Sequence, residues 1–249
     1  MRFILHMLDQ SISLSLYTAQ HKGEEMMKTM ITAHSGADNT KDNSMQFINY
    51  AITTKADALE MDIRRMNDTL VISHDEPDPN NPSTYTDLSV VFLAIRRNPS
   101  IRINCDLKQP GLEAPVLEAA EKLGLEKRLI YSGTVSIDRM KSLPENSITV
   151  FLNIEEYVPD VFNRCAQDPS FIPEAAERIC SICRDGNIPV VNTNYLIATE
   201  QFLTICRKND IGVSVWTVKE EEEMKRFLRD GVTNITTRNL SLALKTAGR

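Results

Sequence analysis

Two carboxylates spaced two residues apart are the first feature of the sequence that points to chemistry. Glu60 and Asp62 lie in the segment ALEMDIR, where acidic and apolar residues alternate. Side chains two apart on a β-strand share a face, so both carboxylates are expected on one face and Met61 on the other. Buried together, the carboxylates repel each other and lose hydration unless a cation compensates them. The spacing therefore indicates a cation site or, taken alone, a solvated strand edge.

The same spacing recurs in Asp106-Leu107-Lys108, which adds a third carboxylate and one ammonium group. Together with Glu60 and Asp62, these residues carry an excess of negative charge that one divalent cation would neutralise. Carboxylate oxygens are the preferred ligands of hard ions, so the pattern predicts Mg²⁺ or Ca²⁺ rather than Zn²⁺. The alternative for Asp106 and Lys108 is a simple salt bridge.

Two histidines accompany these charges. His34 ends the run MITAH, and His74 follows the run TLVIS. An imidazole changes its charge near neutral pH, so two of them at one site can act as general acid and general base. A single histidine at a strand end is more often a structural residue. Their combination with three carboxylates and Lys108 on successive predicted strands favours an active site.

These residues need a scaffold that brings successive strand ends together. Short apolar runs alternate with amphipathic stretches, as in the βα units of a parallel sheet. Strands are predicted at residues 30–34, 57–63, 69–73, 101–107, 128–132, 147–153, 188–193, 212–218 and 232–236, and helices at 43–54, 87–97, 113–123, 136–141, 173–184, 199–209 and 219–229. Segments 57–63 and 69–73 are too close for a parallel crossover, so they are expected to form an antiparallel hairpin. Eight strands remain for an α/β fold of the TIM-type (β/α)8 barrel class, whose active sites lie at the C-terminal ends of the strands.

Length and composition agree with one such barrel. The chain has 249 residues, of which 42% are hydrophobic, and a formal net charge of −6. This charge argues against a long nucleic acid as the main partner, since that affinity comes largely from neutralised phosphates. We expect a single barrel domain over residues 27–249, preceded by an N-terminal extension, residues 1–26, whose role the sequence does not define.

The sequence also gives expectations about location. No run approaches the roughly 20 apolar residues of a membrane span, so no stable membrane insertion is expected. His6, Asp9 and Gln10 interrupt the first apolar stretch, which argues against a signal peptide. The five scattered cysteines, including the Cys180–Cys183 pair in a helical pattern, do not suggest a disulfide framework. We therefore predict a cytoplasmic protein.

In order and spacing, these motifs resemble the glycerophosphodiester phosphodiesterase family of the phospholipase C-like phosphodiesterase superfamily. The resemblance covers residues 30 to about 239 and rests on His34-Ser35-Gly36, Asp42-Asn43-Ser44, Glu60-Met61-Asp62, His74-Asp75, Asp106-Leu107-Lys108, Trp216-Thr217-Val218-Lys219 and Asp230-Gly231-Val232-Thr233. It implies an α/β barrel that hydrolyses glycerophosphodiesters to an alcohol and glycerol phosphate with one divalent cation.

The resemblance also implies a role for each motif. The metal ligands are Glu60, Asp62 and Asp106, the acid–base pair is His34 and His74, and the substrate or phosphate contacts are Lys108, Trp216 and Ser35. Which histidine is the acid stays open, as does the nucleophile: either water or an adjacent hydroxyl of the substrate, which would first give a cyclic phosphate.

The chain departs from the family pattern at three places. Ser35 replaces a phosphate-binding arginine and removes a charged bidentate donor; Lys41 or an arginine of residues 64–65 is our hypothesis for its replacement. Asp106 stands for a glutamate, and residues 236–239 stand for Thr-Asp-x-Pro. Two other functions therefore stay open: a phospholipase D-like enzyme acting on lysolipid headgroups, and a non-catalytic barrel that binds a phosphate ligand.

Overall fold

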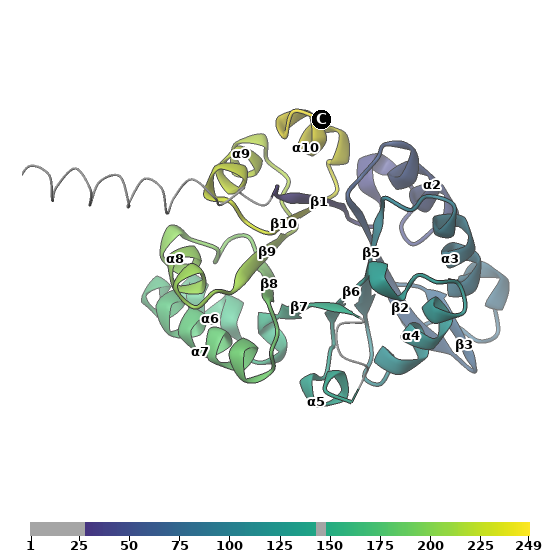
Figure 1. Ribbon diagram of the computed structural model, residues 1–249, viewed down its shortest axis with the longest axis horizontal. Coiled ribbons are helices and arrows are strands. Elements are labelled where there is room, and N and C mark those ends of the chain that lie inside the picture. Colours follow the sequence, from purple (N-terminus) through teal and green to yellow (C-terminus); the bar gives the residue numbers. More distant parts are fainter. Residues whose placement is uncertain (1–27, 143–147) are drawn as a thin grey trace, which may run out of the picture.

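The computed structural model describes residues 28–142 and 148–249, and its centre is a closed ring of eight parallel strands (Figure 1). In ring order, the strands are β1 (Met30–Ala33), β2 (Ala58–Met66), β5 (Arg102–Leu107), β6 (Leu129–Gly133), β7 (Thr149–Asn153), β8 (Val190–Asn194), β9 (Gly212–Trp216) and β10 (Asn234–Thr237). β10 pairs with β1 and closes the ring. The predicted TIM-type barrel is confirmed, whereas the prediction for residues 1–26 lies outside the described residues.

The predicted hairpin is also confirmed. β3 (Thr69–Ile72) pairs antiparallel with β2 through Ile63 and Ile72 and stays outside the ring. A two-residue strand that was not predicted, β4 (Thr86–Asp87), extends this hairpin. Two residues are too few to show an alternation of apolar and polar side chains, so the sequence carries no signal for β4.

Helices surround the ring (Figure 1). They are α2 (Met45–Thr53), α3 (Leu88–Arg96), α4 (Glu113–Glu121), α5 (Ile137–Met140), α6 (Val161–Gln167), α7 (Ile172–Asp185), α8 (Glu200–Lys208), α9 (Glu221–Asp230) and α10 (Leu240–Thr246). Short 3-10 helices are η1 (Ala37–Asn39), η2 (Pro82–Thr84), η3 (Glu126–Arg128), η4 (Ile154–Glu156) and η5 (Pro169–Phe171). All seven predicted helices are present. α6 and α10 were missed because seven residues make only two turns, which show little periodicity.

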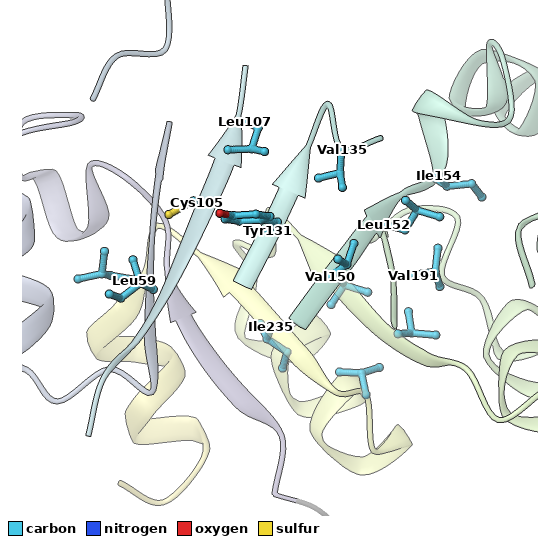
Figure 2. Close-up of a cluster of buried hydrophobic side chains, with 14 of the residues drawn as sticks. Leu59, Cys105, Leu107, Tyr131, Val135, Val150, Leu152, Ile154, Val191 and Ile235 are labelled. Atoms are coloured by element: carbon cyan, nitrogen blue, oxygen red, sulfur yellow. The ribbon is translucent and has the colours of Figure 1, made fainter. Parts of the chain in front are cut away.

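The main hydrophobic core lies between the strands and the helices. On β2, Leu59, Met61 and Ile63 are fully buried in this core, as the alternation of the sequence predicts. Figure 2 shows Leu59 in this layer with side chains from the neighbouring strands, such as Cys105 and Tyr131. The alternate residues of β2, which include the predicted ligands, therefore face the inside of the barrel.

The barrel interior has an apolar and a polar part. Ile130, Phe151 and Val190 form a small second core near the N-terminal ends of their strands. Above it, the buried interior side chains are polar: Thr32, Glu60, Asn104, Ser132, Asn153, Asn192, Ser214, Asn234 and Thr236. Bulky aliphatic side chains usually fill such barrels. A layer of polar side chains inside the barrel, in place of aliphatic ones, is consistent with a polar site that has this layer at its bottom.

All five cysteines lie within the described residues, where they are buried and free, and Cys180 and Cys183 lie on the buried side of α7. In the part of the chain that the structure describes, no helix is both long enough and apolar enough to cross a membrane.

Candidate active site

A cavity of about 730 Å³ opens where the strands of the ring end. We call it the main cavity. All the predicted site residues except Ser35 line it: His34, Glu60, Asp62, His74, Asp106, Lys108 and Trp216. A second cavity of about 480 Å³ shares Asp62 and His74 with it. The barrel therefore gathers residues from widely separated motifs at one place.

Strand register brings the carboxylates together. Asp62 on β2 pairs with Asp106 on the adjacent β5. The Lys108 ammonium lies 2.9 Å from Asp62 Oδ1 and 2.8 Å from Asp106 Oδ2. Burial favours a neutral Lys108, but the two carboxylates outweigh burial and hold its pKa above the ordinary value. Lys108 is thus a charged bridge between two predicted metal ligands.

The two bridged carboxylates differ in their other partners. Burial opposes ionisation of Asp62, yet Lys108 and the Asn43 amide, which donates to Asp62 Oδ2 at 2.6 Å, lower its pKa. Burial raises the pKa of Asp106, whose Oδ1 is buried and has no hydrogen-bond partner among the described residues. Gly133 makes room for this oxygen, since a Cβ there would lie 2.1 Å from it. Asp106 thus presents an unsatisfied acceptor.

Glu60 lies two residues before Asp62 on β2, further from the C-terminal end of the strand. Its Oε2 accepts a hydrogen bond from Asn104 Nδ2 at 2.9 Å, and Asn104 Oδ1 accepts from Ser132 at 3.0 Å. Its Oε1 lies 3.6 Å from His34 Nε2. Burial raises the pKa of Glu60 to about 7, and His34 offsets only part of this effect. Without a further cation, this carboxyl group is therefore partly protonated at neutral pH.

This raised pKa predicts that Glu60→Gln changes how stability depends on pH. In chelator, the folded wild type holds a proton on Glu60 up to about pH 7, whereas the ordinary value is 4.5. The folded state then binds more protons, so stability is lost as the pH rises from about 4.5 to about 7, by on the order of 3 kcal/mol. Glu60→Gln lacks this loss and should gain stability relative to wild type over this range. Denaturant unfolding at pH 5 and pH 8 measures it; parallel pH dependences would contradict the raised pKa.

The donor set suits a hard divalent cation, although the side chains are not arranged around one. Among the described residues, no group of three or more Asp, Glu, His and Cys side chains is close enough together to hold a metal ion. The unsatisfied Asp106 Oδ1 and the raised pKa of Glu60 nonetheless both mark a shortage of positive charge. Carboxylate oxygens that lack positive charge are the ligands that Mg²⁺ and Ca²⁺ prefer. We judge that Glu60, Asp62 and Asp106 fit such an ion.

His34 follows β1, which pairs with β2 on the side away from β5. Its backbone N–H donates to Thr237 O at 2.9 Å, which fixes it against β10. Its Nδ1 lies 2.9 Å from Ser35 O and 3.3 Å from Arg238 Nε. Nδ1 must carry a proton for the first contact and a lone pair for the second, so one tautomer cannot make both hydrogen bonds.

His74 lies at the rim. Its side chain is 70% exposed, with Nδ1 2.9 Å from Asp75 Oδ1. The Ser73 N–H donates to Asp62 O at 2.9 Å, and Arg64 Nε donates to His74 O at 2.9 Å. The backbone around His74 is therefore tied to the strand that carries Asp62, while its ring stays free to meet a substrate.

Ser35 does not lie among the residues of the main cavity. It is 2% exposed, and its hydroxyl oxygen accepts a hydrogen bond from Asn43 N at 2.6 Å. Asn43 in turn donates to the Asp62 carboxylate and accepts from Asp62 N at 3.1 Å. Ser35 thus holds the residue that orients a predicted ligand. The direct role of Ser35 in phosphate binding stays a prediction.

Trp216 forms one wall of the main cavity. Its ring meets Phe162 edge to face at a centroid distance of 5.7 Å. Its Nε1 is buried and has no partner among the described residues. The indole therefore offers an apolar surface and an unused donor.

Four charged residues that line the main cavity were not predicted as site residues: Glu155, Glu156, Lys219 and Arg238. Glu155 lies in η4, two residues after the end of β7. Burial raises its pKa, and its Oε2 is buried without a partner among the described residues. Arg238 follows β10. Each comes just after a predicted strand, and this position was the signal available. Arg64, proposed as a substitute for the missing arginine, contacts His74 O instead.

Comparisons with known proteins bear on the fold that carries this site. No protein-family model matches the chain. The Bacillus subtilis (strain 168) protein YqiK, described only as uncharacterized, is 24% identical over 244 residues, which span 84% of this chain and 94% of YqiK. A glycerophosphodiester phosphodiesterase from Parabacteroides distasonis superposes with a TM-score of 0.70 at 15% identity, over 89% of this chain and 97% of that one.

Two further solved structures are similar over most of their length. The Thermotoga maritima glycerophosphodiester phosphodiesterase has a TM-score of 0.67 at 20% identity, over 87% of this chain and 97% of that one. An Oleispira antarctica phosphodiesterase, solved with the product sn-glycerol-3-phosphate, has a TM-score of 0.67 at 13% identity, over 88% of this chain and 97% of that one. The chain therefore has the α/β-barrel fold of the glycerophosphodiester phosphodiesterases, the family that its motifs resemble.

Proposed function

We propose that this protein is a metal-dependent phosphodiester hydrolase that cleaves glycerophosphodiesters to an alcohol and glycerol phosphate. The observation that supports this most is the shared cavity at the strand ends, lined by two histidines, three carboxylates and a lysine. Neither a structural core nor a simple binding site needs a paired general acid and general base. The Oleispira structure adds that a barrel of this shape accommodates sn-glycerol-3-phosphate.

Glu60, Asp62 and Asp106 would hold one Mg²⁺ or Ca²⁺. Such an ion supplies charge stabilisation at the phosphoryl oxygens as negative charge builds up at phosphorus. Lys108 lies between Asp62 and Asp106 and adds its own positive charge. Trp216 lines the cavity beside them and would pack against the bound substrate.

His34 and His74 would move the protons. One imidazole takes a proton from the attacking water, or from the adjacent hydroxyl of the substrate in a first step that gives a cyclic phosphate, as that oxygen bonds to phosphorus. The other donates a proton to the alkoxide oxygen as the bond between that oxygen and phosphorus breaks, so the proton count balances. His34 is held in the floor near Glu60, whereas His74 is exposed at the rim. The two rings therefore differ in their access to the bulk solvent.

The test is hydrolysis of glycerophosphodiesters with Mg²⁺, with Ca²⁺ and with chelator, measured as release of glycerol phosphate. We expect turnover with at least one ion, its loss in chelator and its return when the ion is added back. If no diester is hydrolysed under any of these conditions, the proposal is wrong and the phosphate-binding alternative takes its place.

A second assay separates this proposal from the lysolipid alternative. Among the described residues, the exposed large hydrophobic side chains are Val90 and Leu93 on the outer helix α3, and Leu196 beside the cavity-lining Tyr195. One leucine at the mouth offers little surface for an acyl chain. We therefore expect faster turnover of water-soluble glycerophosphodiesters than of a lysophospholipid below its micellar concentration. The opposite preference would favour the phospholipase D-like enzyme.

A further inference from the structure

Arg238 has no role in the proposed mechanism. The resemblance implies an arginine at position 35, where this chain has an uncharged serine that is 2% exposed. Arg238 comes from the other end of the sequence and lines the main cavity. We propose that the Arg238 guanidinium binds the phosphate group of the substrate in place of that arginine. The inference rests on the proposed function, because it assumes a phosphodiester in this cavity.

With a phosphodiester bound, the main cavity would hold more negative than positive charge, so another cationic group is expected beside the substrate. Glu60, Asp62 and Asp106 carry three negative charges when ionised, which one divalent cation and Lys108 would balance. Glu155 and Glu156 line the same cavity, and a phosphodiester brings one more negative charge, so negative charge is in excess. The other basic residues that line the cavity, within the described part of the chain, are Lys219 and Arg238. Of these, Arg238 contacts the predicted acid–base residue His34.

The backbone of Arg238 is fixed. It follows the last residue of β10, and its carbonyl accepts a hydrogen bond from Asp38 N at 2.7 Å. The preceding residue, Thr237, is fully buried, and its hydroxyl donates to Val218 O at 2.6 Å. The side chain therefore starts from a defined point at the same end of the barrel as the ligands.

The side chain lies between the two cavities and lines both. Its Nε is 3.3 Å from His34 Nδ1, and its Nη2 is 3.2 Å from Asp42 Oδ1. Gly36 leaves space for this pair, since a Cβ there would lie 1.9 Å from Asp42 Oδ1. No hydrogen bond or ion pair of the described residues uses Nη1.

Weak contacts allow the guanidinium to change partners. The side chains of Arg238 and Asp42 are 46% and 54% exposed, and an ion pair as exposed as this one is weak. The contact with His34 competes with the Ser35 carbonyl for the same nitrogen. A phosphate group offers two oxygens to the planar fork, which is a stronger, bidentate partner. Turning from Asp42 to the phosphate needs only side-chain rotation.

The experiment measures binding of sn-glycerol 3-phosphate by calorimetry with Mg²⁺ present, and KM for a glycerophosphodiester. Arg238→Gln should weaken binding about 10- to 100-fold and raise KM, as expected for a lost hydrogen bond between charged groups. Arg238→Lys keeps the charge without the fork and should lie between wild type and Arg238→Gln. Arg229→Gln, which removes an equal charge from the exposed end of α9, is the matched control and should bind like wild type.

Asp42→Asn separates ligand binding from a structural role. It breaks the ion pair but keeps the guanidinium, so binding should be as tight as in wild type or tighter. A loss that equals that of Arg238→Gln would mean that the pair only supports the fold, and the inference would be wrong. Wild-type affinity in Arg238→Gln would also overturn it, even if the enzyme is active. Arg238-dependent binding without turnover of any diester would instead sustain this inference and refute the proposed function.

Discussion

Alanine at His34 or at His74 is expected to lower turnover by about 10²–10⁴-fold, the usual cost of losing a proton-transfer group. Both rings line the main cavity, but they come from different strands and differ in burial. kcat should fall for both variants, while binding of the divalent cation should change little. Steady-state rates at saturating substrate measure this effect.

The two histidine variants should differ in stability. His74 is 70% exposed, so His74→Ala should leave the melting temperature nearly unchanged. His34 contacts Glu60 and Arg238 in the floor, so His34→Ala should alter stability more. Asp75→Ala is the matched control for His74, because it removes the contact with Nδ1 but keeps the ring. If either alanine variant keeps wild-type kcat, that histidine takes no part in proton transfer.

The sequence was sufficient to predict the elements in which apolar and polar side chains alternate with a regular period. Alternation along β2 placed Leu59 and Met61 outside and Glu60 inside, because a strand has a period of two. The short spacing after β2 predicted the hairpin. The two-residue strand β4 and the seven-residue helix α10 have too few side chains to show a clear period.

The parts of the site that depend on loops could not be predicted in the same way. Ser35 matches a phosphate-binding position in sequence, yet a hydrogen bond from Asn43 keeps it buried. Arg238 follows a strand that was predicted, but nothing local shows that its side chain turns toward His34 and Asp42. The direction of such a side chain depends on partners distant in the sequence. Spacing alone does not contain that information.

Asparagine at Asp106 is expected to weaken binding of the divalent cation by more than about 100-fold, because losing a group that merely supports a ligand already costs 10- to 100-fold. Asparagine keeps the shape of the side chain and removes the charge. Turnover by the Asp106→Asn variant should fall at low metal concentration and recover in part at high metal concentration. The rise in melting temperature with added Mg²⁺ or Ca²⁺ gives the affinity independently of catalysis. If the affinity does not change, Asp106 serves only as the salt-bridge partner of Lys108.

Glu155→Gln is the control. It distinguishes direct coordination of the cation by Asp106 from attraction of the cation by the total negative charge of the cavity. Glu155 and Asp106 line the same cavity, burial raises the pKa of both, and each has a buried oxygen without a partner among the described residues. They differ in position, because only Asp106 pairs in register with Asp62 and shares Lys108 with it. If coordination by neighbouring strands holds the cation, Glu155→Gln should lose much less affinity than Asp106→Asn. Equal losses would mean that the cation responds to the total charge of the cavity, and the assigned set of three ligands would then be wrong.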